Sequence, residues 1–438
     1  MGSHENLKTD VLVVGAGVSG IPAAIAAARA GAQVVLIEED PLIGGAPCDY
    51  YVDMFCGGPL TGILREVEAL LQARYSPTQD ALFFLPEGFQ RAFWTLLRRE
   101  PGVTVLPGAR AVETLVSGAA GEPRVVGVRV EAGLGRTHSR CSGQAFAIQS
   151  QVTIDATGCG AVAIMGGCTA MYGRDAQADF GEPHAPPQRD EQVQECTWMY
   201  ISQQVGGGPP LNMMALEHVE LGVLVNGLGW FHHDPQRAMR VNPRIYLHWG
   251  CRVRCADTRD PLALAQAQTE ALQAMERDHA ILREGGYAVY LAPRIGVRES
   301  NRILGQHVLS ENDLRSGTLP ADTVAVGTYG IDLWGEEGEI SVAERHTPGY
   351  GIPYRSLVPR EADGLLLAGR IISGSHIGMS AYRVMPIAGS IGQAAGVAAA
   401  LCVQQRRQPR DLDAQAVRAL LRSPDQNLQI ELKSQGGP

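Results

Sequence analysis

Three glycines near the N-terminus have the spacing of a loop that binds a diphosphate. Gly15, Gly17 and Gly20 form a G-x-G-x-x-G pattern, and Glu38 ends the next apolar run. In this pattern the first glycine permits a tight turn, the second lets the backbone approach a diphosphate, and the third allows close packing of helix and strand. A carboxylate at Glu38 accepts hydrogen bonds from a ribose diol and repels a 2′-phosphate. The pattern predicts a dinucleotide site.

The residues around these glycines have the pattern of a β–α–β unit. Residues 11–14 are apolar, residues 19–29 are rich in alanine, and residues 33–37 are apolar after Gln33. This order predicts a strand, a helix and a second strand. The helix would aim its unpaired amide groups at the diphosphate, because a helix N-terminus attracts anions. A small-residue turn formed by packing alone is the alternative explanation.

The rest of the chain predicts further β structure and one inserted region. Residues 102–118, 123–133 and 144–158 are β-rich and predict a strand and a small antiparallel meander that returns to the main sheet. From about residue 170 to residue 291 the sequence changes to aromatic-rich stretches and a long helical pattern over residues 261–286. After Pro293 it returns to short strands and ends in a strand, a loop and a helix of small residues.

The amino-acid composition argues against a nucleic-acid-binding protein, a membrane protein and a disulfide-rich secreted protein. The 438 residues hold 37 Lys and Arg against 46 Asp and Glu, a net charge of −9, without the basic stripe that nucleic acid requires. The apolar run 386–403 is interrupted by Ser390 and Gln393, which indicates a buried helix rather than a membrane span. Nine scattered cysteines and the absence of a secretory signal pattern favour a cytoplasmic protein without a disulfide framework. We expect no nucleic-acid or membrane partner and a small-molecule substrate.

Five spaced motifs resemble the FAD-dependent oxidoreductase family of the glutathione-reductase-like flavoproteins with two dinucleotide-binding domains. They are VVGAGVSG with Glu38, DPLIGG, DATG at 155–158, RESNRILG at 298–305 and LLLAGRIISGSHIGMSAYRVMP at 365–386. The resemblance implies an α/β fold. Residues 1–169 and 296–438 would form a Rossmann-like FAD-binding domain with a β-meander, and residues 170–295 an inserted mixed α+β substrate domain.

The resemblance also implies which residues contact FAD. An extended cofactor needs contacts at both ends, so the first β–α–β unit would hold the adenosine and a distant segment would return to the isoalloxazine. The helix that begins near Pro386 would face the flavin with its positive end. The implied contacts are Gly15, Gly17, Val18, Ser19, Gly20, Glu38, Glu39, Gly44, Gly45, Ala46, Ala111, Val112, Ala156, Thr157, Gly158, Gly369, Arg370, Pro386 and Ile387.

Three residues are candidates for chemistry at the flavin. The resemblance puts His376 and Arg383 in a loop beside the isoalloxazine, where His376 would move a proton and Arg383 would clamp a carboxylate or carbonyl. Arg298 begins a shared motif and is a second candidate for substrate or flavin contact. The alternatives are structural: His376 as a buried histidine and Arg298 in a salt bridge with Glu299 or a neighbour.

Cys48 and Cys56 depart from the family pattern. Disulfide reductases place two redox cysteines after the same glycine pair, but closer together than these. If the segment is helical, the two sulfurs lie about 12 Å apart along the axis, too far for a disulfide. Packing, a redox role and covalent attachment of flavin remain open. Cys48, Tyr354 and His232 are candidates to line the substrate pocket, and the scattered Cys and His residues predict no metal site.

The expected function is oxidation or reduction of a small organic molecule by hydride transfer through bound FAD. An oxygen-using oxidase or monooxygenase, a thiol-disulfide oxidoreductase using Cys48 and Cys56, and a flavin-binding redox sensor are the alternatives. The electron partner would be transiently bound NAD(P)H or oxygen, because no second glycine fingerprint marks a nicotinamide domain. The sequence makes no prediction of oligomeric state.

Overall fold

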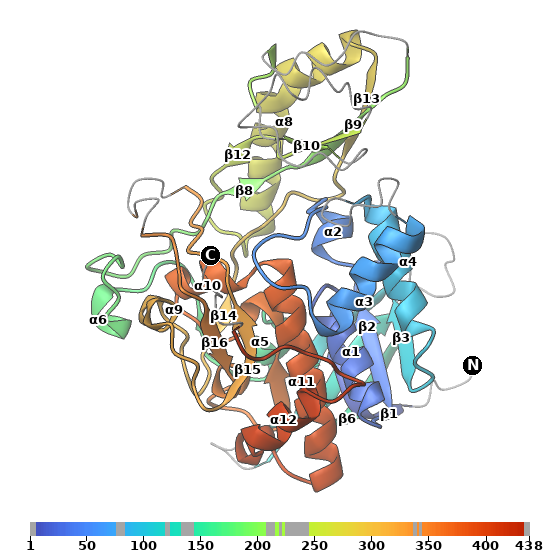
Figure 1. Cartoon of the computed structure of the whole chain (residues 1–438), viewed down its shortest axis with the longest axis vertical. Helices are drawn as coiled ribbons and strands as arrows, with labels where there is room; N and C mark the ends of the chain where they lie inside the picture. The colour runs from blue at the N-terminus through green and yellow to red at the C-terminus, as the bar shows by residue number, and fades with distance from the viewer. Residues whose placement is uncertain are drawn as a thin grey trace, which may run out of the picture.

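Figure 1 shows a large body that holds both the first strands and the last helices of the chain, with a smaller lobe around helix α8 (Pro261–Glu284) above it. The computed structural model describes residues 6–75, 84–118, 123–132, 144–206, 215–218, 221–223, 245–335, 340 and 344–432.

The body is built on a sheet whose central strands are parallel. The order is β3 (Val103–Pro107), β2 (Val34–Glu38), β1 (Leu7–Val14), β6 (Gln144–Asp155), and β17 (Leu365–Leu367) also pairs with β6. The core of this sheet consists of buried apolar runs in residues 11–14 of β1, 34–37 of β2 and 365–367 of β17, as parallel strands covered on both faces require. Val14 is paired with both Ile37 and Asp155, so the carboxyl ends of β1, β2 and β6 meet at one edge. Open α/β sheets bind ligands at this edge.

The predicted meander is confirmed. β4 (Ala109–Ser117) and β5 (Arg124–Ala132) are antiparallel to each other, and β5 is antiparallel to the first half of β6. The second half of β6 pairs with β1 and β17 instead. One long strand therefore joins the meander to the parallel sheet.

Helices α1 (Gly20–Arg29) and α11 (Met385–Gln405) pack against each other beside the sheet. A side chain at Gly392 of α11 would collide with the Ser19 carbonyl, so the two backbones are in close contact. Among the described residues α11 is the one helix long and apolar enough to span a membrane, but 94% of its apolar window is buried inside the protein. The prediction of a buried helix here is confirmed.

The other described helices of the body are short or lie around this core. They are α2 (Ala46–Asp49), α3 (Gly62–Leu70), a π-helical turn η1 (Leu71–Tyr75), α4 (Pro86–Leu97), α5 (Ala161–Met165), α9 (Glu311–Ser316), η3 (Tyr354–Leu357), η4 (Gly369–Ile371), α10 (His376–Tyr382), η5 (Pro409–Asp411) and α12 (Ala414–Leu421).

The lobe has an antiparallel sheet of its own. The order is β10 (Leu221–Val223), β11 (Ile245–His248), β9 (Tyr200–Gln204) and β13 (Tyr287–Leu291). The long helix α8 packs on this sheet, and Asp260 caps its N-terminus by accepting from the Leu262 amide at 3.0 Å. A short pair, β8 (Cys196–Thr197) and β12 (Arg252–Val253), lies between the lobe and the body (Figure 1).

The segment before β8 packs against the body. β7 (Ala170–Met171) pairs with β14 (Arg302–Ile303), and Glu182, which follows α6 (Gln177–Phe180), accepts hydrogen bonds from the Glu311 amide and the Ser375 hydroxyl. We predicted that the inserted domain begins at residue 170, but Asp175, Glu182 and His184 bond to α9 and α10 of the body, and the four-stranded sheet of the lobe begins at Tyr200. The hairpin β15 (Thr323–Gly327) and β16 (Tyr350–Pro353) completes the body.

Candidate active site

A cavity of about 470 Å³ opens at the carboxyl edge of the parallel sheet. Its lining combines residues from both ends of the chain, from the β1–α1 turn to the start of α11. Most of the predicted cofactor contacts lie in this lining: Gly15, Gly17, Val18, Ser19, Glu38, Glu39, Gly45, Ala46, Ala111, Val112, Ala156, Thr157, Gly158, Gly369 and Arg370. The sequence therefore located one continuous site, although the role of each residue there remains a prediction.

Bare backbone forms the floor of the cavity. Gly15 has a φ of 103°, and a side chain there would collide with the Ala156 carbonyl. A Cβ on Gly45 would lie 2.8 Å from the Gly17 Cα, so these two loops touch through their backbones. Three loops thus meet without side chains between them, beside the N-terminus of α1. This arrangement fits a diphosphate, which needs close approach to amide groups.

Two carboxylates fix the loops around this floor. Glu38 accepts hydrogen bonds from the amides of Ala16 at 2.6 Å and Asp40 at 3.1 Å, and burial raises its pKa. Asp155, at the end of β6, is fully buried and accepts from the amides of Thr157 at 3.0 Å and Ala163 at 2.9 Å. Burial also raises the pKa of Asp155. Glu38 lines the cavity and Asp155 supports the loop behind it.

An acidic group with one arginine lies at the adenosine end predicted from Glu38. Arg294 donates to Asp40 at 2.5 Å, lies 3.6 Å from Glu39, and donates its amide to the Asp49 carbonyl at 3.0 Å. Burial, reinforced by the negative charge of Asp40, raises the pKa of Asp49 to about 7. Sequence reasoning missed Arg294, which stands outside every motif. Asp40 begins the DPLIGG motif, although the sequence analysis assigned it no role, and Asp49 could have been found by extending that motif by four residues.

Arginine lines the cavity around the start of α11, and we call this part of the lining the cationic end. Arg383 ends α10 and lines the cavity together with Met385 and Ala388 of the first turn of α11. The Arg383 guanidinium donates through Nη2 to the Asp332 carboxylate at 2.9 Å. Because α11 begins here, its unpaired amides add positive potential. Arg370 also lines the cavity, and its guanidinium donates to the carbonyls of Gly158 and Val297.

Four predicted cofactor contacts lie behind the lining. Gly20 packs against the Gly15 carbonyl, and Gly44 packs against the Cys48 sulfur. Pro386 and Ile387 pack against Gly58, where an added Cβ would lie 3.2 Å and 3.4 Å from them. The prediction that these four residues touch the cofactor is not supported by their positions. The first turn of α11 does reach the cavity, but through Met385 and Ala388.

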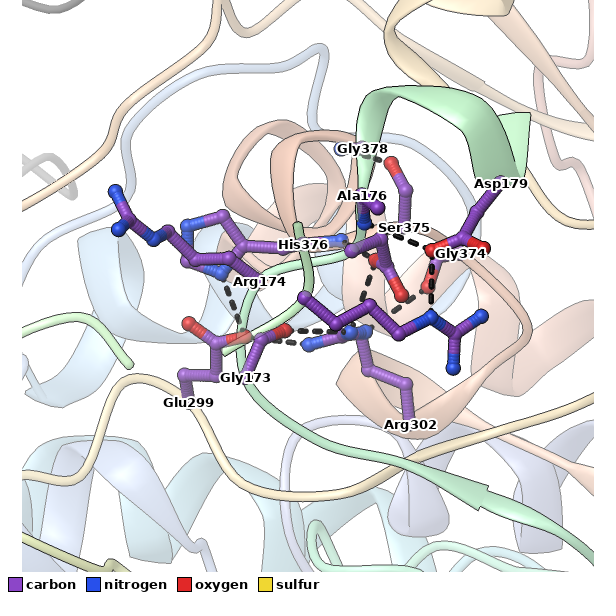
Figure 2. A network of polar contacts seen from close by, with 12 residues as sticks. Gly173, Arg174, Ala176, Asp179, Glu299, Arg302, Gly374, Ser375, His376 and Gly378 are labelled. Atoms are coloured by element: carbon purple, nitrogen blue, oxygen red, sulfur yellow. Dashed lines mark hydrogen bonds and ion pairs between the residues drawn. The ribbon is translucent and has the colours of Figure 1, made fainter. Parts of the chain in front are cut away.

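His376 is not where we expected it. Ser375 caps the N-terminus of α10 and makes His376 the first residue of that helix rather than part of a loop. Its side chain is 2% exposed and bonds to Glu299 through Nδ1 at 2.9 Å, while its amide donates to Asp175 at 2.9 Å. Figure 2 shows this network, in which Arg302 joins Glu299 and Asp175. His376 is not among the described residues that line the cavity, so we assign it a structural role.

Arg298 lies near the cationic end. Its guanidinium stacks on the Trp334 ring, 3.9 Å from the centroid, and donates to the Glu195 carbonyl at 2.7 Å and to the Thr197 hydroxyl. Burial, together with the positive charge of Arg383, lowers the pKa of Arg298 to about 9. The structural alternative, a salt bridge of Arg298 with Glu299, does not form, because Glu299 pairs with Arg302 and His376.

The other candidates do not form a reactive group. Cys48 and Cys56 are free, only Ala46–Asp49 is helical around them, and burial raises the pKa of Cys48 strongly and that of Cys56 to about 11. Tyr354 is buried in the core and donates to the Pro409 carbonyl at 2.8 Å, away from the cavity lining. His232 lies outside the described residues. Within the part of the chain that the structure describes, no group of His, Cys, Asp and Glu side chains could hold a metal.

The site therefore fits a dinucleotide, with bare backbone for the diphosphate, a carboxylate for the ribose and a cationic end beside the start of α11. Among solved structures, the chain is similar to a myxobacterial halogenase, CndH (14% identity over 95% of this chain and 79% of that chain, TM-score 0.42). It is also similar to a geranylgeranyl bacteriochlorophyll reductase-like protein from Thermoplasma acidophilum (15%, 95% and 83%, TM-score 0.41). A third is the 3-ketosteroid-delta4-(5alpha)-dehydrogenase of Rhodococcus jostii RHA1 (14%, 91% and 98%, TM-score 0.37). The model of the family described as FAD dependent oxidoreductase matches residues 10–421. The chain belongs to this family of enzymes, whose cofactor is FAD.

Proposed function

We propose that this enzyme oxidises or reduces a small organic molecule by hydride transfer, with the substrate held at the cationic end of the cavity. The observation that supports this most is the position of Arg383. It lies in the cavity lining beside the first turn of α11. An arginine there can orient a polar substrate over the reactive part of a cofactor whose adenosine lies at Glu38.

The residues of this chain would divide the work along the cavity. The turn from Gly15 to Ser19 and the α1 amides bind the diphosphate, and Glu38 binds the ribose. Bound FAD supplies the two-electron chemistry. Arg383 donates hydrogen bonds to the substrate and stabilises charge that develops on it, in a site already ordered by Asp332.

Thiol-disulfide exchange is the less favoured alternative. The reactive form of a cysteine is the thiolate, and burial raises the pKa of both Cys48 and Cys56 above the ordinary range. Both side chains are therefore mainly in the unreactive thiol form near neutral pH.

Anaerobic reduction of the bound flavin tests the proposal. NADH, NADPH and a panel of small alcohols, amines and hydroxy acids are mixed with the holoenzyme, and oxygen is then admitted rapidly. We expect at least one organic compound to exchange electrons with the flavin, and Arg383→Gln to slow that step by about 10- to 100-fold. Arg360→Gln, at an exposed arginine outside the cavity lining, is the control. A reaction that Arg383→Gln leaves unchanged, with full flavin content, would refute the assigned role. Fast reoxidation would identify an oxygen-using enzyme, and no reaction with any compound would favour a sensor.

A further inference from the structure

Asp332 holds Arg383 in one orientation. Its Oδ2 atom accepts three hydrogen bonds, from the Tyr329 hydroxyl at 3.0 Å, the Trp334 indole at 2.9 Å and Arg383 Nη2 at 2.9 Å. The Asp332 carbonyl accepts a second bond from the same Nη2 at 3.2 Å. One nitrogen of the guanidinium is thus fully engaged, and the residues around it cannot rotate without breaking this set of bonds.

The other nitrogens of Arg383 have no hydrogen-bond partner among the residues that the structure describes. Nε is buried without a hydrogen-bond partner, and Nη1 makes no hydrogen bond to the described residues. Unpaired buried donors are rare in folded proteins, because each costs free energy that water would otherwise recover. Since Arg383 lines the cavity, a ligand is the natural source of the missing acceptor.

The local charge does not balance. Arg298 is linked to Arg383 through Trp334 and Asp332, and it forms no ion pair with a carboxylate in the described ranges. Glu195, whose carbonyl it touches, directs its carboxylate toward Arg254 at 3.6 Å. Among the described residues, Asp332 is therefore the one carboxylate that forms an ion pair with either guanidinium, and it pairs with Arg383. An excess buried charge of this kind is costly unless an anion binds.

We propose that the substrate carries a carboxylate, which is bound by Arg383, and that Arg298 supplies the positive charge that Asp332 would otherwise cancel. The inference rests on the proposed function, because it assumes that the flavin occupies the same cavity. A carboxylate accepts charge-assisted hydrogen bonds from an arginine better than a neutral carbonyl does. Arg298 acts here as a positioning residue through its field.

Isosteric ligand pairs test this directly. Benzoate and benzamide, and butyrate and butyramide, are titrated into the holoenzyme while the visible flavin spectrum reports binding. We expect the wild type to bind each carboxylate at least about tenfold more tightly than its amide. Arg298→Gln should weaken carboxylate binding by about 10- to 100-fold and leave amide binding unchanged. Arg298→Lys should recover most of the loss, and Arg254→Gln, an exposed arginine nearby, should bind like the wild type.

The outcomes separate this inference from the proposed function. Three results would overturn the inference: equal affinity for carboxylate and amide, no binding of any carboxylate, or an Arg298→Gln variant that still prefers the carboxylate over the amide. In each case an enzyme that holds flavin and remains active leaves the proposed function intact. A change in flavin reduction potential in Arg298→Gln without a change in carboxylate affinity would also overturn it, because the charge would then serve the cofactor. An enzyme that holds flavin but exchanges no electrons would overturn the function instead.

Discussion

Replacing Arg302 with methionine tests the network that orders α10. Arg302 is 1% exposed and donates to the carbonyls of Gly374 at 3.0 Å and Gly173 at 2.9 Å. It also pairs with Glu299 at 2.5 Å and Asp175 at 3.1 Å (Figure 2). Methionine keeps much of the volume but removes every donor, so two buried carboxylates lose their cation.

The expected cost follows from these contacts. Breaking a buried ion pair by removing one partner costs about 3–5 kcal/mol of unfolding free energy. A chain of 438 residues has an unfolding entropy of about 0.9 kcal/mol/K, so Arg302→Met should lower the thermal midpoint by about 3–5 °C. Circular dichroism and the release of flavin fluorescence both report the transition.

A matched variant and a double variant complete the test. Arg129 pairs with Glu113 on the surface, where both side chains are about half exposed, so Arg129→Met should change stability by less than about 1 kcal/mol. Adding Glu299→Gln to Arg302→Met should recover part of the loss, because one of the unpaired charges disappears. The reasoning is refuted if Arg302→Met has the same thermal midpoint as the Arg129→Met control. It is also refuted if the double variant is less stable than the wild type by the full sum of the Arg302→Met and Glu299→Gln effects measured separately.

Three further predictions concern the cavity. Gly45→Ala should weaken FAD binding at least about tenfold, because Gly45 has a φ of 64° and an added Cβ would collide with the Gly17 backbone. The control is Gly206→Ala, whose added Cβ would meet no atom within 4 Å, and it should bind FAD normally in the same titration. Burial raises the pKa of Asp49 from an ordinary 3.8 to about 7, so between these pH values the folded state binds more protons than the unfolded state. The thermal midpoint should therefore fall as the pH rises from about 4 to about 7, and Asp49→Asn should reduce that fall. If Asp49→Asn has the same pH profile of the thermal midpoint as the wild type, Asp49 is ionised normally. The double variant Cys48→Ala, Cys56→Ala should keep its flavin and its rate of flavin reduction within about threefold; complete loss of electron transfer with flavin retained would instead support the thiol alternative.

Local patterns predicted the elements that local forces determine. The glycine turn, α1, β2, the meander and the long helix α8 all formed where hydrophobic periodicity and turn residues placed them. The α/β fold class and the family were predicted correctly for the same reason, since five motifs kept their order along the chain.

The errors came from contacts between residues far apart in the sequence. His376 was placed in a loop because its neighbours resemble a flavin-contacting segment, but Ser375 starts a helix there and Glu299 and Asp175 pull the residue into the interior. Arg294 reaches the acidic end of the cavity from outside every motif. No periodicity or spacing reports such tertiary pairings.

The absorption spectrum of the purified chain, recorded before and after acid precipitation, tests the central claim that both ends of the chain build one FAD site. We predict a flavin spectrum with one FAD per chain, released into the supernatant by acid because neither Cys48 nor Cys56 is needed to hold it. A colourless protein that takes up no added FAD would contradict the account.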